Sequence, residues 1–188
     1  MTGDEFQKEL ETRLEPGVKV YWTRLILDHN LWIEAMDLAL GKRPPVPFRA
    51  SYALEGAFFE KPDDFVPYHQ RFVRDFCTAT DESVFRHYGK MMAHLLKRQW
   101  LTLSDDEATA VAEEACVRLI DSRLRVAVRA WSLEVLLLLR GRVGWIDEEW
   151  AGIIEQLRID PSPGIQSCLR RLKTAKTVSP SVTGVGVA

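Results

Sequence analysis

The chain has 188 residues, of which 46% are hydrophobic and 28% are charged, an ordinary composition for one globular domain. Its 25 lysines and arginines against 27 aspartates and glutamates leave a net charge of -2, which argues against a general polyanion binder. The three cysteines are far apart and odd in number, so neither a disulfide framework nor a zinc site is indicated.

The first 47 residues are expected to form a helical cap. Helical periodicity predicts an amphipathic helix over Thr2–Leu14 and two helices over Val18–Leu40, followed by a Pro-rich linker over residues 41–47. No stretch at the N-terminus has the apolar core of a signal peptide, which favours a cytoplasmic location. The most apolar segment, Val126–Leu139, is shorter than the ~20 residues that cross a bilayer, so we expect no membrane contact.

From Phe48 onward, pairs of helices recur along the chain. The first helices of the pairs are expected to begin near residues 48, 82 and 124, and the second helices near residues 64, 105 and 147. A helix pair every ~40 residues is the period of armadillo and HEAT arrays, in which neighbouring pairs stack to bury a continuous core. The sequence therefore predicts an all-α fold, a right-handed α-α superhelix of HEAT-like helical hairpins over residues 48–176, and a disordered tail over 177–188.

Local signals support these helices. Acidic clusters stand at residues 63–64, 105–107 and 147–149, where each second helix should start and where the helix dipole favours negative charge. Ser104 and Glu107 have the spacing of a capping box. Four side chains of the last two long helices are predicted to share one buried core: Leu133, Leu137, Trp150 and Ile153.

Three stretches resemble a family of small, single-domain bacterial HEAT-repeat proteins, armadillo-like α-solenoids of unassigned function. They are Arg49–Leu54 with Lys61 and Pro62 ahead of the next helix, Arg125–Leu133, and Ser162–Ser167. The resemblance implies a superhelical fold and no particular chemistry. Some members are labelled adenylosuccinate lyase, but the Gly-Ser-Ser-rich catalytic loop of that superfamily has no counterpart in this chain.

Catalytic and metal-binding patterns are weak in this sequence. His87 and His94 share a helical face, but no carboxylate or third histidine stands at ligand spacing beside them. Cys77 and Cys116 fall on apolar helix faces, which is typical of core packing rather than of a reactive thiol. There is no P-loop, nucleophile elbow or dinucleotide-binding glycine pattern. We therefore expect no enzyme activity, no catalytic residue, no metal and no cofactor.

The leading hypothesis is a non-enzymatic protein-binding module of unknown pathway, with its partner on a concave face lined by the second helices. The polar residues expected on that face are Arg71, Arg74, Asp75, Glu113, Glu114, Arg118, Glu155 and Arg158. Their mixed charge suits a polar protein segment more than a phosphate backbone, so we do not expect nucleic-acid binding. The alternative is a nucleic-acid-binding or DNA-glycosylase-like α-solenoid, suggested by Trp131, Trp145 and Trp150 near several arginines.

Overall fold

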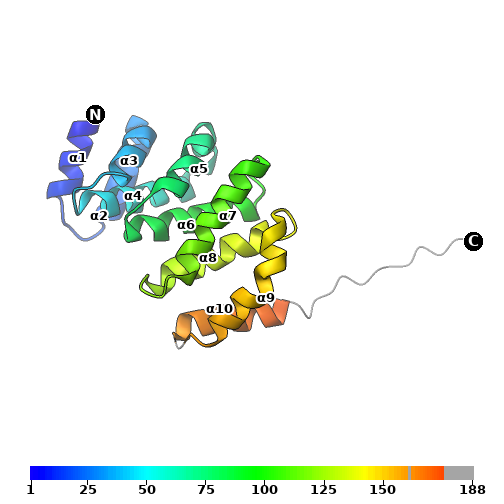
Figure 1. Ribbon diagram of the computed structural model, residues 1–188. Coiled ribbons are helices and arrows are strands. Elements are labelled where there is room, and N and C mark those ends of the chain that lie inside the picture. Colours follow the sequence, from blue (N-terminus) through cyan, green and yellow to red (C-terminus); the bar gives the residue numbers. More distant parts are fainter. Residues whose placement is uncertain (161, 176–188) are drawn as a thin grey trace, which may run out of the picture.

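The computed structural model describes residues 1–160 and 162–175, most of which lie in helices (Figure 1). In chain order the elements are α1 (Gly3–Thr12), α2 (Val18–His29), α3 (Trp32–Ala39), α4 (Val46–Glu60), the 3-10 helix η1 (Pro62–Tyr68), α5 (His69–Thr78), α6 (Glu82–Lys97), α7 (Asp105–Ile120), α8 (Val126–Leu139), α9 (Gly144–Arg158) and α10 (Pro163–Ala175). Because the described residues include no strand, the prediction of an all-α fold is confirmed. None of the described helices is both long and apolar enough to cross a membrane.

Side chains at the helix starts explain several of these boundaries. The hydroxyl of Ser104 accepts a hydrogen bond from the backbone N–H of Glu107, and the Glu107 carboxylate accepts one from the N–H of Ser104, so the predicted capping box of α7 is confirmed. Thr2 and Glu5 form a second capping box at the start of α1. The carboxylate of Asp81 accepts from the N–H of Ser83 at 2.8 Å and caps α6.

Three boundaries differ from the prediction. Helix α4 already begins at Val46 with Pro47 in its first turn, where the missing N–H of proline costs nothing, so the linker is shorter than 41–47. Residues Pro62–Tyr68 form a 3-10 turn before α5 rather than its first α-helical turn. Helix α9 begins at Gly144, so Asp147 does not cap it; its carboxylate instead accepts hydrogen bonds from Arg140 and from the Gly141 N–H.

The helices pack in two rows. In one, which we call the even row, α2, α4, α6, α8 and α10 follow one another, each packed against the next. The other, which we call the odd row, consists of α3, α5 and α7. Helix α5 packs against α7, while α3 and α7 pack across against α4 and α8 of the even row. Glycines bring even-row helices close together: a Cβ added at Gly56 of α4 would lie 2.1 Å from Oγ1 of Thr23 in α2, and one at Gly164 of α10 would lie 2.3 Å from Cγ1 of Val126 in α8.

One apolar core connects these rows and extends from Phe6 in α1 to Leu169 in α10. The N-terminal helices α2 and α3 belong to this core, since both pack against α4. Of the four side chains predicted in the core of the last long helices, Leu133, Trp150 and Ile153 are buried. Leu137 is only half-buried, which corrects the prediction for that residue.

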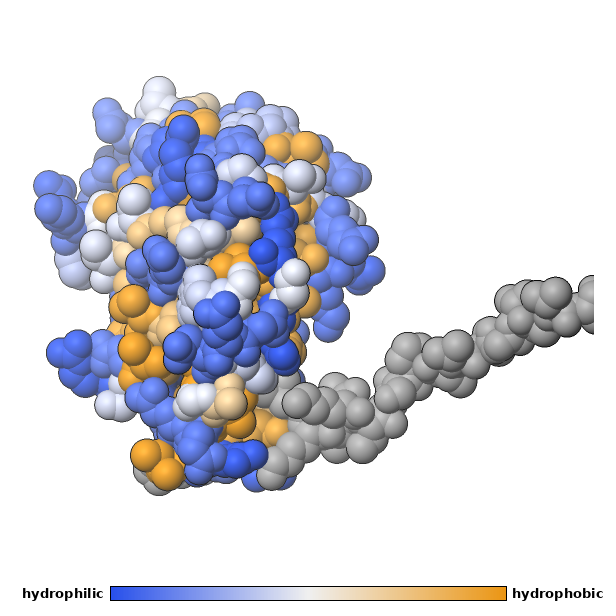
Figure 2. Space-filling view, turned by 45° about the vertical axis from the view of Figure 1, so that its right-hand side comes forward, coloured by the Kyte–Doolittle hydropathy of each residue, from blue (hydrophilic) through white to orange (hydrophobic). Residues whose placement is uncertain are grey.

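The surface is mixed in character. The face in Figure 2 is mostly hydrophilic, and its apolar side chains lie in small groups between charged ones. Scattered exposed apolar residues are normal for a globular protein and by themselves mark no site. The predicted tail over 177–188 lies outside the described residues.

Candidate functional site

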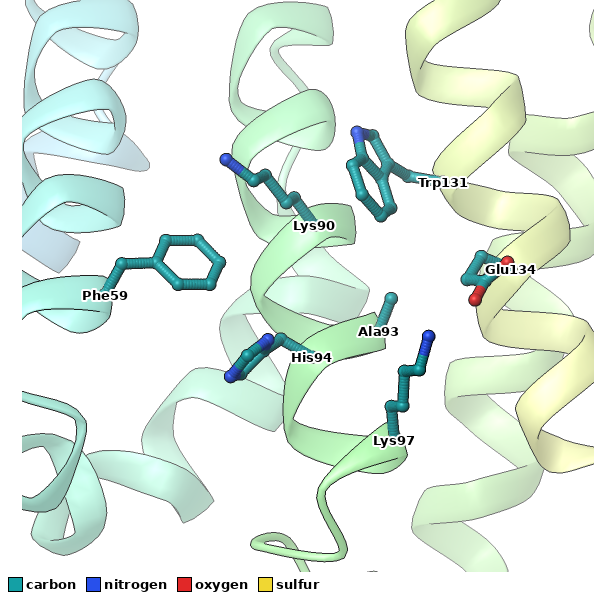
Figure 3. Close-up of a pocket in the computed structure, with 7 residues that line it drawn as sticks. All are labelled: Phe59, Lys90, Ala93, His94, Lys97, Trp131 and Glu134. Atoms are coloured by element: carbon teal, nitrogen blue, oxygen red, sulfur yellow. The ribbon is translucent and has the colours of Figure 1, made fainter.

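A shallow cavity of about 190 Å³ lies on the even row where α4, α6 and α8 meet (Figure 3). We call it the α6 groove. It is lined by Phe59, Lys90, Ala93, His94, Lys97, Trp131 and Glu134. Small-molecule and cofactor sites usually enclose roughly 300–1,000 Å³. The α6 groove is smaller than these and has the size to hold a single large side chain.

The periodicity of α6 places three basic side chains along this groove. Val84, Tyr88, Met92 and Leu95 are buried and turn one face of the helix toward the core. The outward positions 90, 94 and 97 are then occupied by lysine, histidine and lysine. With this spacing their side chains follow one line along the helix surface.

Aromatic side chains stand on both sides of α6. Figure 3 shows Phe59 reaching toward α6 from α4 and Trp131 reaching toward it from α8. Phe59 is 38% exposed and meets the His94 ring edge-on, with the ring centroids 5.0 Å apart. The Nζ atom of Lys90 lies 4.6 Å from the centroid of the Phe59 ring, within cation–π distance. The groove therefore combines apolar walls with positive charge.

A buried carboxylate positions one of the two groove lysines. Glu55 of α4 accepts a hydrogen bond from Nζ of Lys90 at 2.8 Å, lies 2.5 Å from Nδ1 of His87, and lies 3.4 Å from Nζ of Lys19. Burial acts to raise the pKa of Glu55, but the hydrogen bonds from His87 and Lys90 and the neighbouring charges outweigh it and lower the pKa to about 2. Glu55 is therefore ionised and links α2, α4 and α6.

The positive charge of the groove also acts on His94. Burial and then the charges of Arg98, Lys90 and Lys97 lower the pKa of His94, so its imidazole is neutral at pH 7. Burial is the largest cause of this shift, and the three neighbouring cations add to it. These cations would also stabilise an anionic group placed beside His94.

The residues predicted to form a binding face on the second helices occupy the odd row and α9, and two of them, Asp75 and Arg118, are buried. Asp75 is buried and pairs with Nε of Arg71 at 2.7 Å, while Nη2 of Arg71 lies 2.7 Å from Asp37. Arg118 is also buried; its Nη2 donates to the carbonyl of Phe76 at 2.5 Å. Asp75 and Arg118 are thus turned toward the interior: the Asp75 carboxylate pairs within α5, and the Arg118 guanidinium joins α7 to α5 through the Phe76 carbonyl.

The other members of that set either form ion pairs on their own helix or face solvent. Glu114 pairs with Nε of Arg118 at 3.0 Å, and Glu155 pairs with Arg158 at 2.6 Å on the surface of α9. Arg74 and Glu113 are exposed. The structure therefore brings together neighbours four or three residues apart on the same helix.

The arginines that suggested nucleic-acid binding are largely engaged in intramolecular contacts. Arg129 is buried; its Nη1 lies 2.5 Å from Asp160, and its Nε donates to the carbonyl of Leu119. Arg140 pairs with Asp147, and Arg142 donates to the carbonyl of Leu103. These guanidinium groups tie segments of the fold together and leave little charge for a phosphate backbone.

The structure gives little support to a metal site at the histidines or to a reactive thiol at Cys77 or Cys116. His87 contacts the buried Glu55 whereas His94 lies in the groove, so the two do not share a site. In the described part of the chain, no group of three His, Cys, Asp or Glu side chains could hold a metal ion. Burial raises the pKa of the Cys77 and Cys116 thiols, which disfavours the reactive thiolate.

Two groove residues, His94 and Trp131, stand out in the sequence, but beside His87 and beside several arginines rather than beside each other. Nothing in the sequence predicts that Phe59, Lys90 and Lys97 share a groove with them. A partial signal was available in the 90, 94 and 97 spacing of basic residues opposite the apolar stripe of α6. Comparisons with protein-family models, with curated proteins and with solved structures gave no significant match.

Proposed function

We propose that the chain is a HEAT-like right-handed α-α superhelix, related to the bacterial HEAT-repeat family that its sequence resembles, and that it acts in the cytoplasm as a non-enzymatic protein-binding module. In this proposal the α6 groove receives one large side chain from a partner protein. The observation that carries the proposal is the groove itself, in which Phe59 and Trp131 flank a lysine-bearing helix around a cavity of about 190 Å³.

The packing supports placing the partner on the even row rather than on the second helices. Helices of a curved stack lie closest on its inner side, and the concave side is the surface that solenoids use for binding. The close approaches at Gly56 and Gly164 are both between even-row helices. We therefore propose the even row as the concave row, which replaces the face predicted from the sequence.

The chemistry of the lining favours binding over catalysis. The groove side chains are aromatic, basic, one alanine and one glutamate, with no hydroxyl or thiol nucleophile among them. Two lysines and Glu134 leave a small positive excess there. Affinity for a phosphate backbone depends on several lysine or arginine contacts, so a protein segment is favoured over nucleic acid as the ligand.

Selection from a phage-displayed dodecapeptide library tests this proposal on the full chain. We expect enriched peptides that bind the wild type and lose at least tenfold in affinity with Phe59→Ala. Arg74→Ala, on the odd row, should bind them unchanged. A 20-nucleotide oligothymidylate and a duplex of the same length should not bind at 100 mM salt. Failure to enrich any peptide would contradict the proposal, and tight, salt-sensitive oligonucleotide binding would favour the nucleic-acid alternative.

A further inference from the structure

Within the α6 groove, the ammonium group of Lys97 is not paired with any described residue, whereas that of Lys90 is. Lys19 and Lys90 both pair with Glu55, and Arg24 pairs with Glu60 at 2.8 Å. Lys97 is exposed and forms no ion pair or hydrogen bond through its ammonium group with any described residue. The negative end of the α6 dipole favours a cation at this position. This interaction is not a discrete ion pair, so the ammonium group can still bind an external anion.

Lys97 and the neighbouring Lys90 and Arg98 outnumber the one acidic residue in the lining of the groove. Lys90, Lys97 and Arg98 all act on His94 as positive charges and lower its pKa together with burial. The carboxylate of Glu55 is already shared by Lys90, Lys19 and His87. Glu134 is the one acidic residue in the lining of the groove, and no ion pair joins it to Lys97. The groove therefore retains an uncompensated positive charge beside its apolar walls.

The walls define the second part of the ligand. Phe59 is 38% exposed and Trp131 is half-buried, and they face the groove from opposite sides of α6 (Figure 3). Ala93 is buried between them and leaves space above the helix. A large apolar side chain inserted there would cover exposed aromatic surface at roughly 25 cal/mol per Å².

We infer that the α6 groove recognises an acidic peptide segment with a large apolar anchor, whose carboxylates meet Lys97 and the Lys90 edge of the groove. This inference rests on the proposed function and adds the chemistry of the partner to it. A short acidic segment can pair with the ammonium of Lys97 and with that of Lys90, which also donates to Glu55. A nucleic-acid strand would need a longer track of cations than the two lysines that line the groove.

A fluorescein-labelled heptapeptide tests this inference, with phenylalanine at its centre and three aspartates or glutamates on each side. Its binding to the full chain is followed by fluorescence anisotropy at 50 mM and 150 mM salt. We expect saturable binding that weakens with salt, weakens at least tenfold with Lys97→Glu and weakens several-fold with Lys97→Gln. Arg74→Glu is the matched control, because it makes the same change of charge at an exposed residue of α5, and it should change the affinity less than twofold.

Two further peptides separate the parts of the inference. Replacing the acidic residues by lysine should abolish binding, and replacing the central phenylalanine by serine should weaken it at least fivefold. Equal binding of the lysine peptide, or no effect of either Lys97 variant, would overturn the inference. If library-selected peptides of basic or neutral composition bind through Phe59 while the acidic peptide does not, the proposed function stands and this inference is wrong. If neither kind of peptide binds, both are wrong.

Discussion

Gly89 of α6 faces Trp131 of α8 so closely that a Cβ added to Gly89 would lie 3.0 Å from the Cβ of Trp131. The absence of a side chain at position 89 lets α8 pack directly against α6. This contact lies one residue before Lys90 and carries Trp131, which forms one wall of the α6 groove. The shape of the groove therefore depends on a glycine that does not line it.

Valine at this position should separate the two helices. We expect Gly89→Val to destabilise the fold by about 1–3 kcal/mol, because the added atoms have no space beside Trp131. Gly152→Val is the matched control in α9, where nothing lies within 4 Å of an added Cβ, and it should change stability by less than about 0.5 kcal/mol. Urea unfolding followed by circular dichroism measures both; equal stability of the two variants would contradict the close approach.

Arg118 is expected to matter for stability rather than for binding. Its guanidinium is buried, donates to the Phe76 carbonyl and lies 4.0 Å from the centroid of the Phe85 ring. Arg118→Ala should cost about 3 kcal/mol, since it removes one partner of a largely buried ion pair with Glu114. The exposed Arg74→Ala should leave the melting temperature within 1–2 °C, roughly the effect of a surface change. An Arg118→Ala variant as stable as Arg74→Ala would show that Arg118 is not part of the interior.

Two leucines of α8 provide a graded test of the core. Leu133 is buried, so Leu133→Ala should cost about 2–5 kcal/mol, the range for truncation in a packed core. Leu137 is half-buried, so Leu137→Ala should cost less than half as much. Thermal melts of the two variants under one buffer condition decide the order. If Leu137→Ala cost more than Leu133→Ala, α8 would turn the side that carries Leu137 toward the core, which would contradict the structure.

Glu55 should make stability depend on pH in the acid range. Its pKa is lowered from an ordinary value of 4.5 to about 2, so its contribution is complete above pH 4.5 and is lost as the pH falls toward 2. A shift of this size corresponds to about 3 kcal/mol. Glu55→Gln should be less stable than the wild type at pH 6, and the difference should shrink between pH 4.5 and 2. A difference that stays constant over this range would show that the Glu55 carboxylate is not preferentially ionised in the folded state.

Helix content and several helix ends could be predicted from the sequence because they depend on neighbouring residues. The apolar stripe of α6 and the capping box at Ser104 are local patterns, and both are present in the structure. The start of α9 was misplaced because Asp147 finds partners in Arg140 and Gly141 rather than in the N–H groups of its own helix.

The candidate site could not be predicted because it depends on contacts between distant parts of the chain. Charged residues on a helix give no sign of which row will cover them. Arg118 is buried because Phe76 and Phe85, from two other elements, surround its guanidinium. Likewise, Phe59 and Trp131 form one groove only because Gly89 brings α8 against α6.

The most direct test of the account is to map where a bound peptide lies. Two-dimensional NMR of the full chain, labelled with ¹⁵N, records the shift of each backbone amide and of the tryptophan indoles as the acidic phenylalanine heptapeptide is added. We expect the largest shifts at Phe59, Lys90, His94, Lys97 and the Trp131 indole. Shifts concentrated instead at Arg71, Arg74 and Glu113 of the odd row would contradict it.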